Sequence, residues 1–222
     1  MSAAKSNPQV VLRPQDLLVV LRLALSREPA PSYAALAAEL GLTASATHAG
    51  VARAVQAQLA RKDQDGKPQA VREALRLFLQ HGARYCFPAT RGGLTRGWPT
   101  GYAAEPLRAS ILQPNEPPPV WPDKAGPVRG VAFHPLYPSV PHAIAQNPAL
   151  YELLALFDAV RGGSPRERAL ALPLLEQRLA MNPNDSNIVL LGLGKPDLKG
   201  SVLHSGEMLS PAVPPEDWEA NP

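Results

Sequence analysis

The side chains that most often bind metals or act in catalysis are few in this sequence. They are one cysteine and five histidines: Cys86, His48, His81, His134, His142 and His204. Their spacing matches no zinc-binding pattern with each other or with acidic residues, and no arrangement of Ser, His and Asp selects a catalytic set. We therefore expect no metal, no cofactor and no catalytic residue, and we predict that the chain is not an enzyme.

One glycine-rich segment could suggest phosphate chemistry. Gly192, Gly194 and Lys195 stand together, as in a phosphate-binding loop. Such a loop needs a strand before it and a helix after it, whereas Pro196 follows the lysine directly. We therefore discount a nucleotide site at this position.

The charged residues are distributed unevenly. Residues 1–100 hold 13 Lys or Arg against 6 acidic residues, whereas residues 101–222 hold 9 against 13. The net charge of +3 at pH 7 thus combines a basic first half with an acidic second half. One basic end is typical of a protein that meets nucleic acid with that end only, although chance unevenness gives the same numbers.

Local signals in the basic half predict three helices, over residues 14–26, 33–40 and 45–61. Pro14 suits the first position of a helix, where its missing N–H costs nothing. Ser32 is a suitable N-cap for the second helix, and Gly41 can end that helix in a left-handed conformation. Thr43 or Ser45 can cap the third helix, whose apolar residues recur at helical spacing.

The segment 33–55 resembles the helix-turn-helix of the winged-helix bacterial regulators, the broad group that includes MarR-like proteins. The resemblance rests on a small residue in the second helix, glycine at the turn, an apolar residue after it and an aliphatic residue in the third helix: Ala37, Gly41, Leu42 and Val51. Two steeply crossed helices need such contacts. The resemblance covers residues 14–61 only, the second half is not recognised, and a purely structural pair of alanine-rich helices is the alternative.

The resemblance implies that the helix from Ser45 to Arg61 is a recognition helix in the major groove. The residues it implies as DNA contacts are Ser45, His48, Arg53, Gln56, Arg61 and Lys62. Residues 61–68 are too short for a long wing, so we expect the wing as a hairpin of 83–87 with 95–102. Arg91 and Arg96 would lie at its tip and enter a minor groove, and an Arg/Gly loop without DNA contact is the alternative.

The expected fold class is mainly α with a small β component. The expected parts are a flexible tail (1–12), a winged helix-turn-helix domain (13–104), a Pro-rich connector (105–127), a helical dimerisation or partner-binding domain (128–181) and an extended tail (182–222). Crowded prolines predict little regular structure in the connector. Helices are expected over 148–161 and after Ser164, and the apolar island 188–193 is a candidate strand.

These features predict a sequence-specific DNA-binding transcriptional regulator, a repressor that binds double-stranded DNA as a homodimer. The leucine stripes of 151–161 and 166–179 are the expected dimer surface. The alternative is a protein-interaction module, such as an antitoxin or defence-system accessory protein, that binds a partner with its second half.

The apolar run Leu17–Leu25 is broken by Arg22 and is shorter than the roughly 20 residues of a membrane span. With no secretory signal layout either, we expect a cytoplasmic protein without membrane contact.

Overall fold

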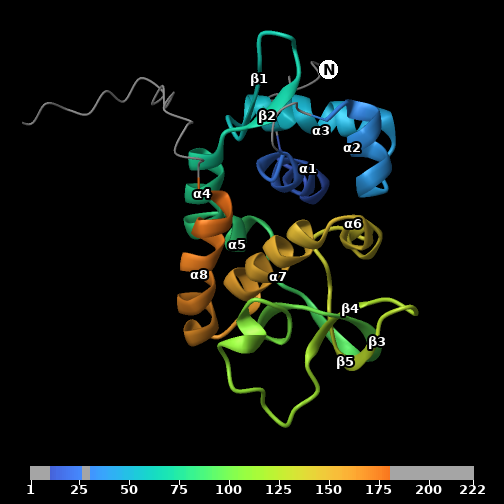
Figure 1. Ribbon diagram of the computed structural model, residues 1–222, viewed down its shortest axis with the longest axis vertical. Coiled ribbons are helices and arrows are strands. Elements are labelled where there is room, and N and C mark those ends of the chain that lie inside the picture. Colours follow the sequence, from blue (N-terminus) through green and yellow to red (C-terminus); the bar gives the residue numbers. More distant parts are fainter. Residues whose placement is uncertain (1–10, 27–30, 181–222) are drawn as a thin grey trace, which may run out of the picture. The chain divides into compact units, whose positions relative to one another are not determined.

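The computed structural model describes residues 11–26 and 31–180, which are mainly helical with two small sheets (Figure 1). The helices are α1 (Pro14–Ala24), α2 (Tyr33–Leu40), α3 (Ala44–Gln56), α4 (Arg72–His81), α5 (Ala83–Cys86), α6 (Val140–Gln146), α7 (Pro148–Gly162) and α8 (Pro165–Leu179). The strands are β1 (Ala60–Lys62), β2 (Pro68–Ala70), β3 (Arg91–Pro99), β4 (Pro119–Pro122) and β5 (Val128–Phe133), and η1 (Gly101–Ala103) and η2 (Leu107–Ala109) are short 3-10 helices. The prediction of a mainly helical protein with a small β component is confirmed at this coarse level.

Helix α1 lies at the centre of the core. The Asp16 carboxylate accepts the backbone N–H of Arg13 at 2.9 Å, which satisfies a backbone donor at the start of the helix. Residues Leu17, Leu18, Val19, Val20 and Leu21 are all 0% exposed. Five consecutive residues cover every side of a helix, so α1 buries all of its faces. It packs against both α3 and α7, and Figure 1 shows it between them.

The cap residues predict correctly where α2 and α3 begin and where the chain turns between them. Ser32 Oγ accepts the N–H of Ala35 at 3.2 Å, and Thr43 Oγ1 accepts that of Ala46 at 3.1 Å. Gly41 has a φ of 62°, the left-handed conformation expected at the end of α2. These contacts confirm the predicted second helix, the turn and the capping of the third helix.

Helix α3 is shorter than predicted, because it ends at Gln56 and not at Arg61. Gln58 has a φ of 60°, which is incompatible with a right-handed helix. The chain reverses there, and Leu59 is only 6% exposed as a result. The carbonyl of Leu59 accepts the N–H of Val71 at 2.9 Å, beside the pairing of β1 with β2. Burial of Leu59 and strand pairing therefore outweigh the helical preference of this segment.

Strands β1 and β2 form a short antiparallel hairpin in the region that is too short for a long wing. The Asp63 carboxylate accepts the backbone N–H groups of Asp65 at 3.0 Å and Lys67 at 2.8 Å, which fixes the turn. Because β2 takes up residues 68–70, α4 begins only at Arg72.

The predicted hairpin of residues 83–87 with 95–102 is wrong. Residues 83–86 form the short helix α5. Strand β3 pairs antiparallel with both β4 and β5, and these two pair with each other in parallel, so the three strands close into a small barrel. The sequence did not indicate this sheet, because β4 lies among the prolines of the expected connector, 105–127. That segment also contains η2.

Closure of the barrel brings the strands so near that side chains have no room at two glycines. A Cβ on Gly97 would lie 2.0 Å from the carbonyl oxygen of Trp121. A Cβ on Gly130 would lie 2.0 Å from the carbonyl oxygen of Pro118. Glycine is therefore required at both positions for the strands to pair.

Helix α7 is joined to the barrel through a buried carboxylate. Asp158, only 2% exposed, accepts hydrogen bonds from Thr100 Oγ1 at 2.8 Å, Trp121 Nε1 at 2.6 Å and Arg161 Nε at 2.7 Å. Burial raises the pKa of Asp158, while Arg161 and the two other donors favour the ionised form. These contacts fix α7 to β4 and to the residue that follows β3.

The leucine stripe of 151–161, predicted as a dimer surface, is buried inside the protein, so that prediction is wrong for α7. Residues Leu153 to Arg161 are each at most 8% exposed, and α7 packs against α1, α6 and α8. Helix α8 begins after Ser164 as predicted, and Ser164 Oγ caps it by accepting the N–H of Glu167 at 3.3 Å. The buried residues of α8 are Ala171, Leu175 and Leu179. The second leucine stripe therefore also contributes to the core of the chain.

Several predicted features lie outside the described residues. They are most of the tail 1–12, the island 188–193 and the tail 182–222. In the part of the chain that the structure describes, none of the helices has the length and apolar character needed to cross a membrane.

Candidate nucleic-acid interface on helix α3

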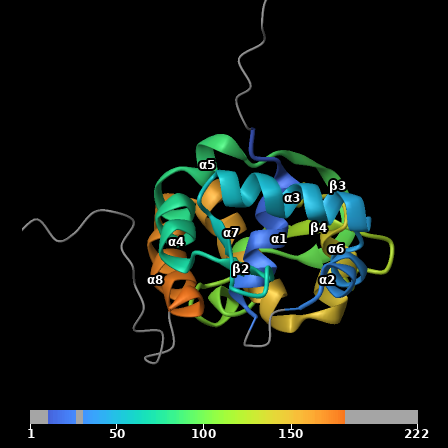
Figure 2. The ribbon, with the colours of Figure 1, turned by 90° about the horizontal axis from the view of Figure 1, so that it is seen from above.

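One side of α3 is open to solvent, and Figure 2 shows the helix crossing α1. The exposed residues on this side are Ser45, His48, Ala49, Ala52 and Gln56, which we call the α3 strip. They recur at three- and four-residue spacing, as on one face of a helix. The buried residues on the other side are Thr47, Gly50, Val51 and Ala54. The strip therefore offers a hydroxyl, an imidazole and an amide, with the methyl groups of two alanines between the imidazole and the amide.

Arg53, a predicted DNA contact, is instead engaged within the protein. Its Nε and Nη2 donate to the two carboxylate oxygens of Asp16 at 2.7 Å each, and the Asp16 side chain is 0% exposed. These hydrogen bonds raise the pKa of Arg53. Gly50, three residues earlier on α3, leaves room for this pair, because a Cβ there would make a tight contact of 3.0 Å with Asp16 Oδ1. Arg53 thus positions α3 on α1. The sequence signal for this ion pair is Asp16, a single acidic residue directly before five consecutive apolar residues, because an acid at the start of a buried helix needs a basic partner.

His48 is exposed as predicted, but one face of its ring is covered. The ring of Tyr33, at the start of α2, stacks on it with centroids 3.7 Å apart and an interplanar angle of 11°. Burial raises the pKa of the Tyr33 hydroxyl. Sequence reasoning missed Tyr33, because helical spacing relates residues within one helix and not across a turn. The stack orients the imidazole, whose edge carries the two nitrogen atoms.

Arg61 and Lys62 are exposed on β1, directly after α3. Arg61 Nε donates to Gln69 Oε1 on β2 at 3.3 Å, a contact that leaves its other donors available. Lys67 is exposed at the other end of the turn. The hairpin thus brings basic side chains close to α3 in the chain, although Arg61 does not lie on the helix as predicted.

Arg91 and Arg96 do not belong to this surface. Both lie on β3, and Figure 1 places the barrel on the other side of α7 from α3. Arg91 Nη2 donates to the carbonyl oxygen of Gly162 at 3.0 Å, and its guanidinium lies 5.3 Å from the ring centroid of Phe133. The structure therefore brings five of the eight predicted residues together on α3 and the hairpin. Arg53 pairs with Asp16 inside the protein, and Arg91 and Arg96 lie apart from this surface on the barrel.

The C-terminal end of α2 is held by α6. Ser139 Oγ donates to the carbonyl oxygen of Leu40 at 2.6 Å, and His142 Nε2 lies 3.1 Å from that of Ala38. The Ala38 carbonyl also accepts the N–H of Gly41 at 3.4 Å, so the side chains from α6 add to the backbone contact that ends α2. The sequence could not indicate this docking, since about 100 residues separate the partners.

Glu39 adds a polar contact between α1, α2 and α7. Its Oε1 accepts hydrogen bonds from Arg22 Nε at 2.6 Å and Asn147 Nδ2 at 2.9 Å. Partial burial raises the pKa of Glu39, but the hydrogen bonds from Arg22 and Asn147 outweigh it, and the pKa is lowered. Together with the contacts from α6, this interaction fixes the helix pair to the body of the protein.

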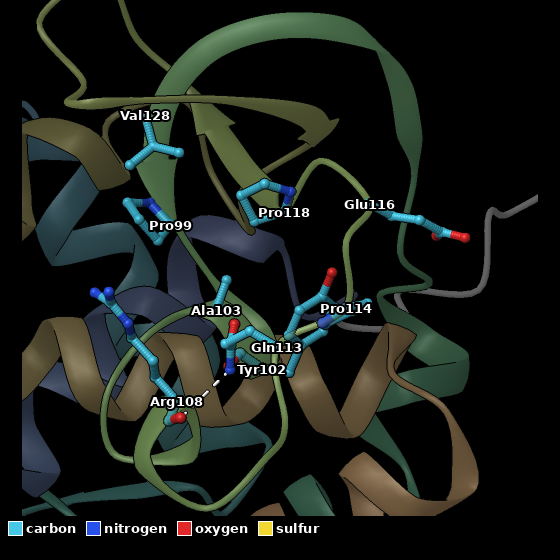
Figure 3. A pocket seen from close by; sticks show the side chains of 9 residues that line it. All are labelled: Pro99, Tyr102, Ala103, Arg108, Gln113, Pro114, Glu116, Pro118 and Val128. Atoms are coloured by element: carbon cyan, nitrogen blue, oxygen red, sulfur yellow. Dashed lines mark hydrogen bonds between the residues drawn. The ribbon is translucent and has the colours of Figure 1, made fainter.

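A shallow hollow lies beside η1 and the loop that leads to β4 (Figure 3). Three prolines and Tyr102 are among its nine lining residues. Gln113 Nε2 donates to the carbonyl oxygens of Tyr102 at 3.4 Å, Arg108 at 3.3 Å and Ile111 at 2.9 Å, so its amide holds the loop. Figure 3 shows the side chain of Glu116 pointing away from the other residues. The lining thus offers few polar groups that converge on a ligand.

Within residues 11–26 and 31–180, no group of three or more His, Cys, Asp or Glu side chains is placed to hold a metal ion. Comparison of the chain with protein-family models, with curated proteins and with solved structures gave no match.

Proposed function

We propose that the protein is a winged helix-turn-helix regulator that binds double-stranded DNA through the α3 strip and the hairpin β1–β2. The observation that supports this most is the open strip on α3, which follows a left-handed turn and precedes an antiparallel hairpin. In the family that residues 14–61 resemble, the recognition helix has this place in the chain and two strands follow it. Such a helix enters the major groove with its N-terminal half.

In this proposal the residues of the α3 strip contact different parts of the DNA. His48 and Gln56 carry hydrogen-bonding groups for base edges, and Ser45 in the first turn of α3 contacts a phosphate. Ala49 and Ala52 offer apolar contact to thymine methyl groups and let the helix approach the bases closely. Because only two side chains hydrogen-bond to bases, we expect DNA shape and phosphate contacts to supply much of the affinity.

The hairpin supplies the positive charge that the strip lacks. Arg61 and Lys62 are exposed on β1 and contact phosphates beside the groove. Each phosphate contact releases counterions, so binding weakens steeply as salt rises. Arg53 contributes by holding α3 on α1, through its hydrogen bonds with Asp16. In this proposal the protein represses transcription as a homodimer that reads a palindromic site.

The test is fluorescence anisotropy with labelled duplexes from the DNA upstream of the gene. Ala52→Glu places a negative charge in the middle of the strip, and Gln177→Glu on the exposed side of α8 is the matched control. We expect Ala52→Glu to weaken binding at least about tenfold, from phosphate repulsion and steric blocking, and the control to bind like the wild type. No binding at low salt, or an equal loss in both variants, would contradict the proposal.

The absence of Lys and Arg from the α3 strip also favours a second candidate function, binding of a partner protein. An antitoxin or a defence-system accessory protein would use such a neutral surface. Co-purification of one defined polypeptide that is lost in Ala52→Glu but kept in Gln177→Glu, with DNA binding absent from the wild type, would favour this candidate over the first.

A further inference from the structure

A pair of arginines lies on the barrel, away from α3. Arg96 on β3 and Arg129 on β5 are directly opposite each other in the antiparallel register, and both are exposed. Directly opposite residues project from the same face, with Cβ atoms about 4.5–5.5 Å apart. Like charges in this arrangement destabilise a sheet. An anion bound between the two guanidinium groups would remove that repulsion.

No acidic side chain neutralises this pair in the described part of the chain. Arg96 Nη1 has a long contact of 3.3 Å with the carbonyl oxygen of Gly126, and neither arginine forms an ion pair among the described residues. Asp123 is close in the fold, since its N–H donates to the carbonyl oxygen of Arg96 at 3.0 Å. Its carboxylate, however, accepts from Trp98 Nε1 at 3.1 Å and from the backbone N–H of Ala125 at 2.9 Å.

The two arginines line a shallow hollow that is open to solvent. Its volume is about 330 Å³, and its walls are Leu94, Thr95, Arg96 and Arg129. Leu94 is 58% exposed, so an apolar surface adjoins the two cations. The hollow therefore combines a doubly positive end with an apolar end.

We propose that this hollow binds a phosphate group of a nucleotide or of a single-stranded nucleic acid. Guanidinium forks bind phosphate oxygens bidentately, and a phosphate group offers oxygen atoms to both forks at once. The exposed leucine offers an apolar contact to the attached sugar or base. The two sources share one chemistry, the phosphate on Arg96 and Arg129. The site is separate from the α3 strip and does not depend on duplex binding there.

The test uses the full chain labelled with ¹⁵N and follows the arginine Nε–Hε signals by NMR at constant ionic strength. The probes are sodium pyrophosphate, adenosine triphosphate and a short single-stranded oligonucleotide. We expect the Arg96 and Arg129 signals to shift, and Arg129→Gln to raise the dissociation constant about tenfold through loss of charge-assisted hydrogen bonds. Arg166→Gln, on the exposed start of α8, is the matched control and should bind like the wild type.

Each outcome decides the proposal. The proposal is supported if the Arg96 and Arg129 signals shift with all three probes, or with pyrophosphate and adenosine triphosphate only. Whichever of the oligonucleotide and the triphosphate binds with the lower dissociation constant identifies the source of the phosphate. No shift with any probe overturns the proposal, and so does an equal loss in Arg129→Gln and Arg166→Gln, which would indicate diffuse charge attraction. Arg129→Gln should unfold at the same temperature as the wild type or higher, because it relieves repulsion. Phosphate binding that survives Ala52→Glu separates this site from the proposed DNA surface.

Discussion

The substitution Arg53→Met tests whether Arg53 belongs to the core or to the DNA surface. It keeps much of the side-chain volume but removes the cation that pairs with Asp16, whose side chain is 0% exposed. Removing one partner of a buried ion pair costs about 3–5 kcal/mol, because the other charge stays buried without compensation. Since the Arg53 side chain is 20% exposed, water can reach the vacated position. We therefore expect a loss near the lower end, about 3 kcal/mol.

A double-mutant cycle measures this interaction directly. The four proteins are the wild type, Arg53→Met, Asp16→Asn and the double variant, compared by urea unfolding at neutral pH. Asp16→Asn keeps an acceptor for the N–H of Arg13 and removes the charge. In that background Arg53→Met should cost only about 1 kcal/mol, the ordinary value of a lost hydrogen bond. The expected coupling energy is then about 2 kcal/mol, within the range for residues in contact.

Two results would refute this account of Arg53. The first is a coupling energy below about 0.5 kcal/mol, the value for independent sites. The second is a large loss of DNA affinity in Arg53→Met with the free energy of unfolding unchanged. That outcome would return Arg53 to the DNA surface and would mean that the contact with Asp16 contributes little to folding.

Three further perturbations have defined outcomes. Gly130→Ala should lower the free energy of unfolding by at least about 3 kcal/mol, because its Cβ would lie 2.0 Å from the Pro118 carbonyl oxygen, whereas Gly93→Ala, with open space around it, should cost under about 0.5 kcal/mol in the same urea assay. The pKa of Glu39 is lowered, so its carboxylate stabilises the fold above the unfolded value of about 4.3, and this stability is lost as pH falls through the folded pKa. Glu39→Gln should therefore destabilise the protein at neutral pH, and the difference from the wild type should shrink as pH falls through the folded pKa in unfolding experiments; a difference that stays constant with pH would contradict this. Lys62→Ala should reduce the slope of log affinity for DNA against log salt by about 1, and an unchanged slope would exclude a phosphate contact.

The features predicted correctly from the sequence depend on residues a few positions apart. The Ser32 and Thr43 caps and the turn at Gly41 each act within one turn of helix, so the local residue types suffice to predict them. The exposed positions of His48 and Gln56 follow in the same way, because one helical period separates the buried side from the open one.

The features that were missed depend on contacts distant in sequence. Arg53 and Asp16 are separated by 37 positions, and only the crossing of α1 and α3 shows that the arginine points inward. Leu59 ends the predicted helix because its burial in the core is worth more than one more helical turn. Strand β4 pairs within a barrel although prolines surround it, and the register that demands Gly130 becomes visible only when the three strands are together.

The burial of α1 on all sides determines how the two proposed sites relate. One side of α1 packs on α3 and another on α7, and the barrel lies beyond α7 in Figure 1. The α3 strip and the pair Arg96–Arg129 are therefore separated by the core. A duplex in contact with α3 and the hairpin does not supply the phosphate that Arg129 binds. The two sites thus engage separate ligands, so a loss at one site carries no information about the other, and each must be tested with its own probe.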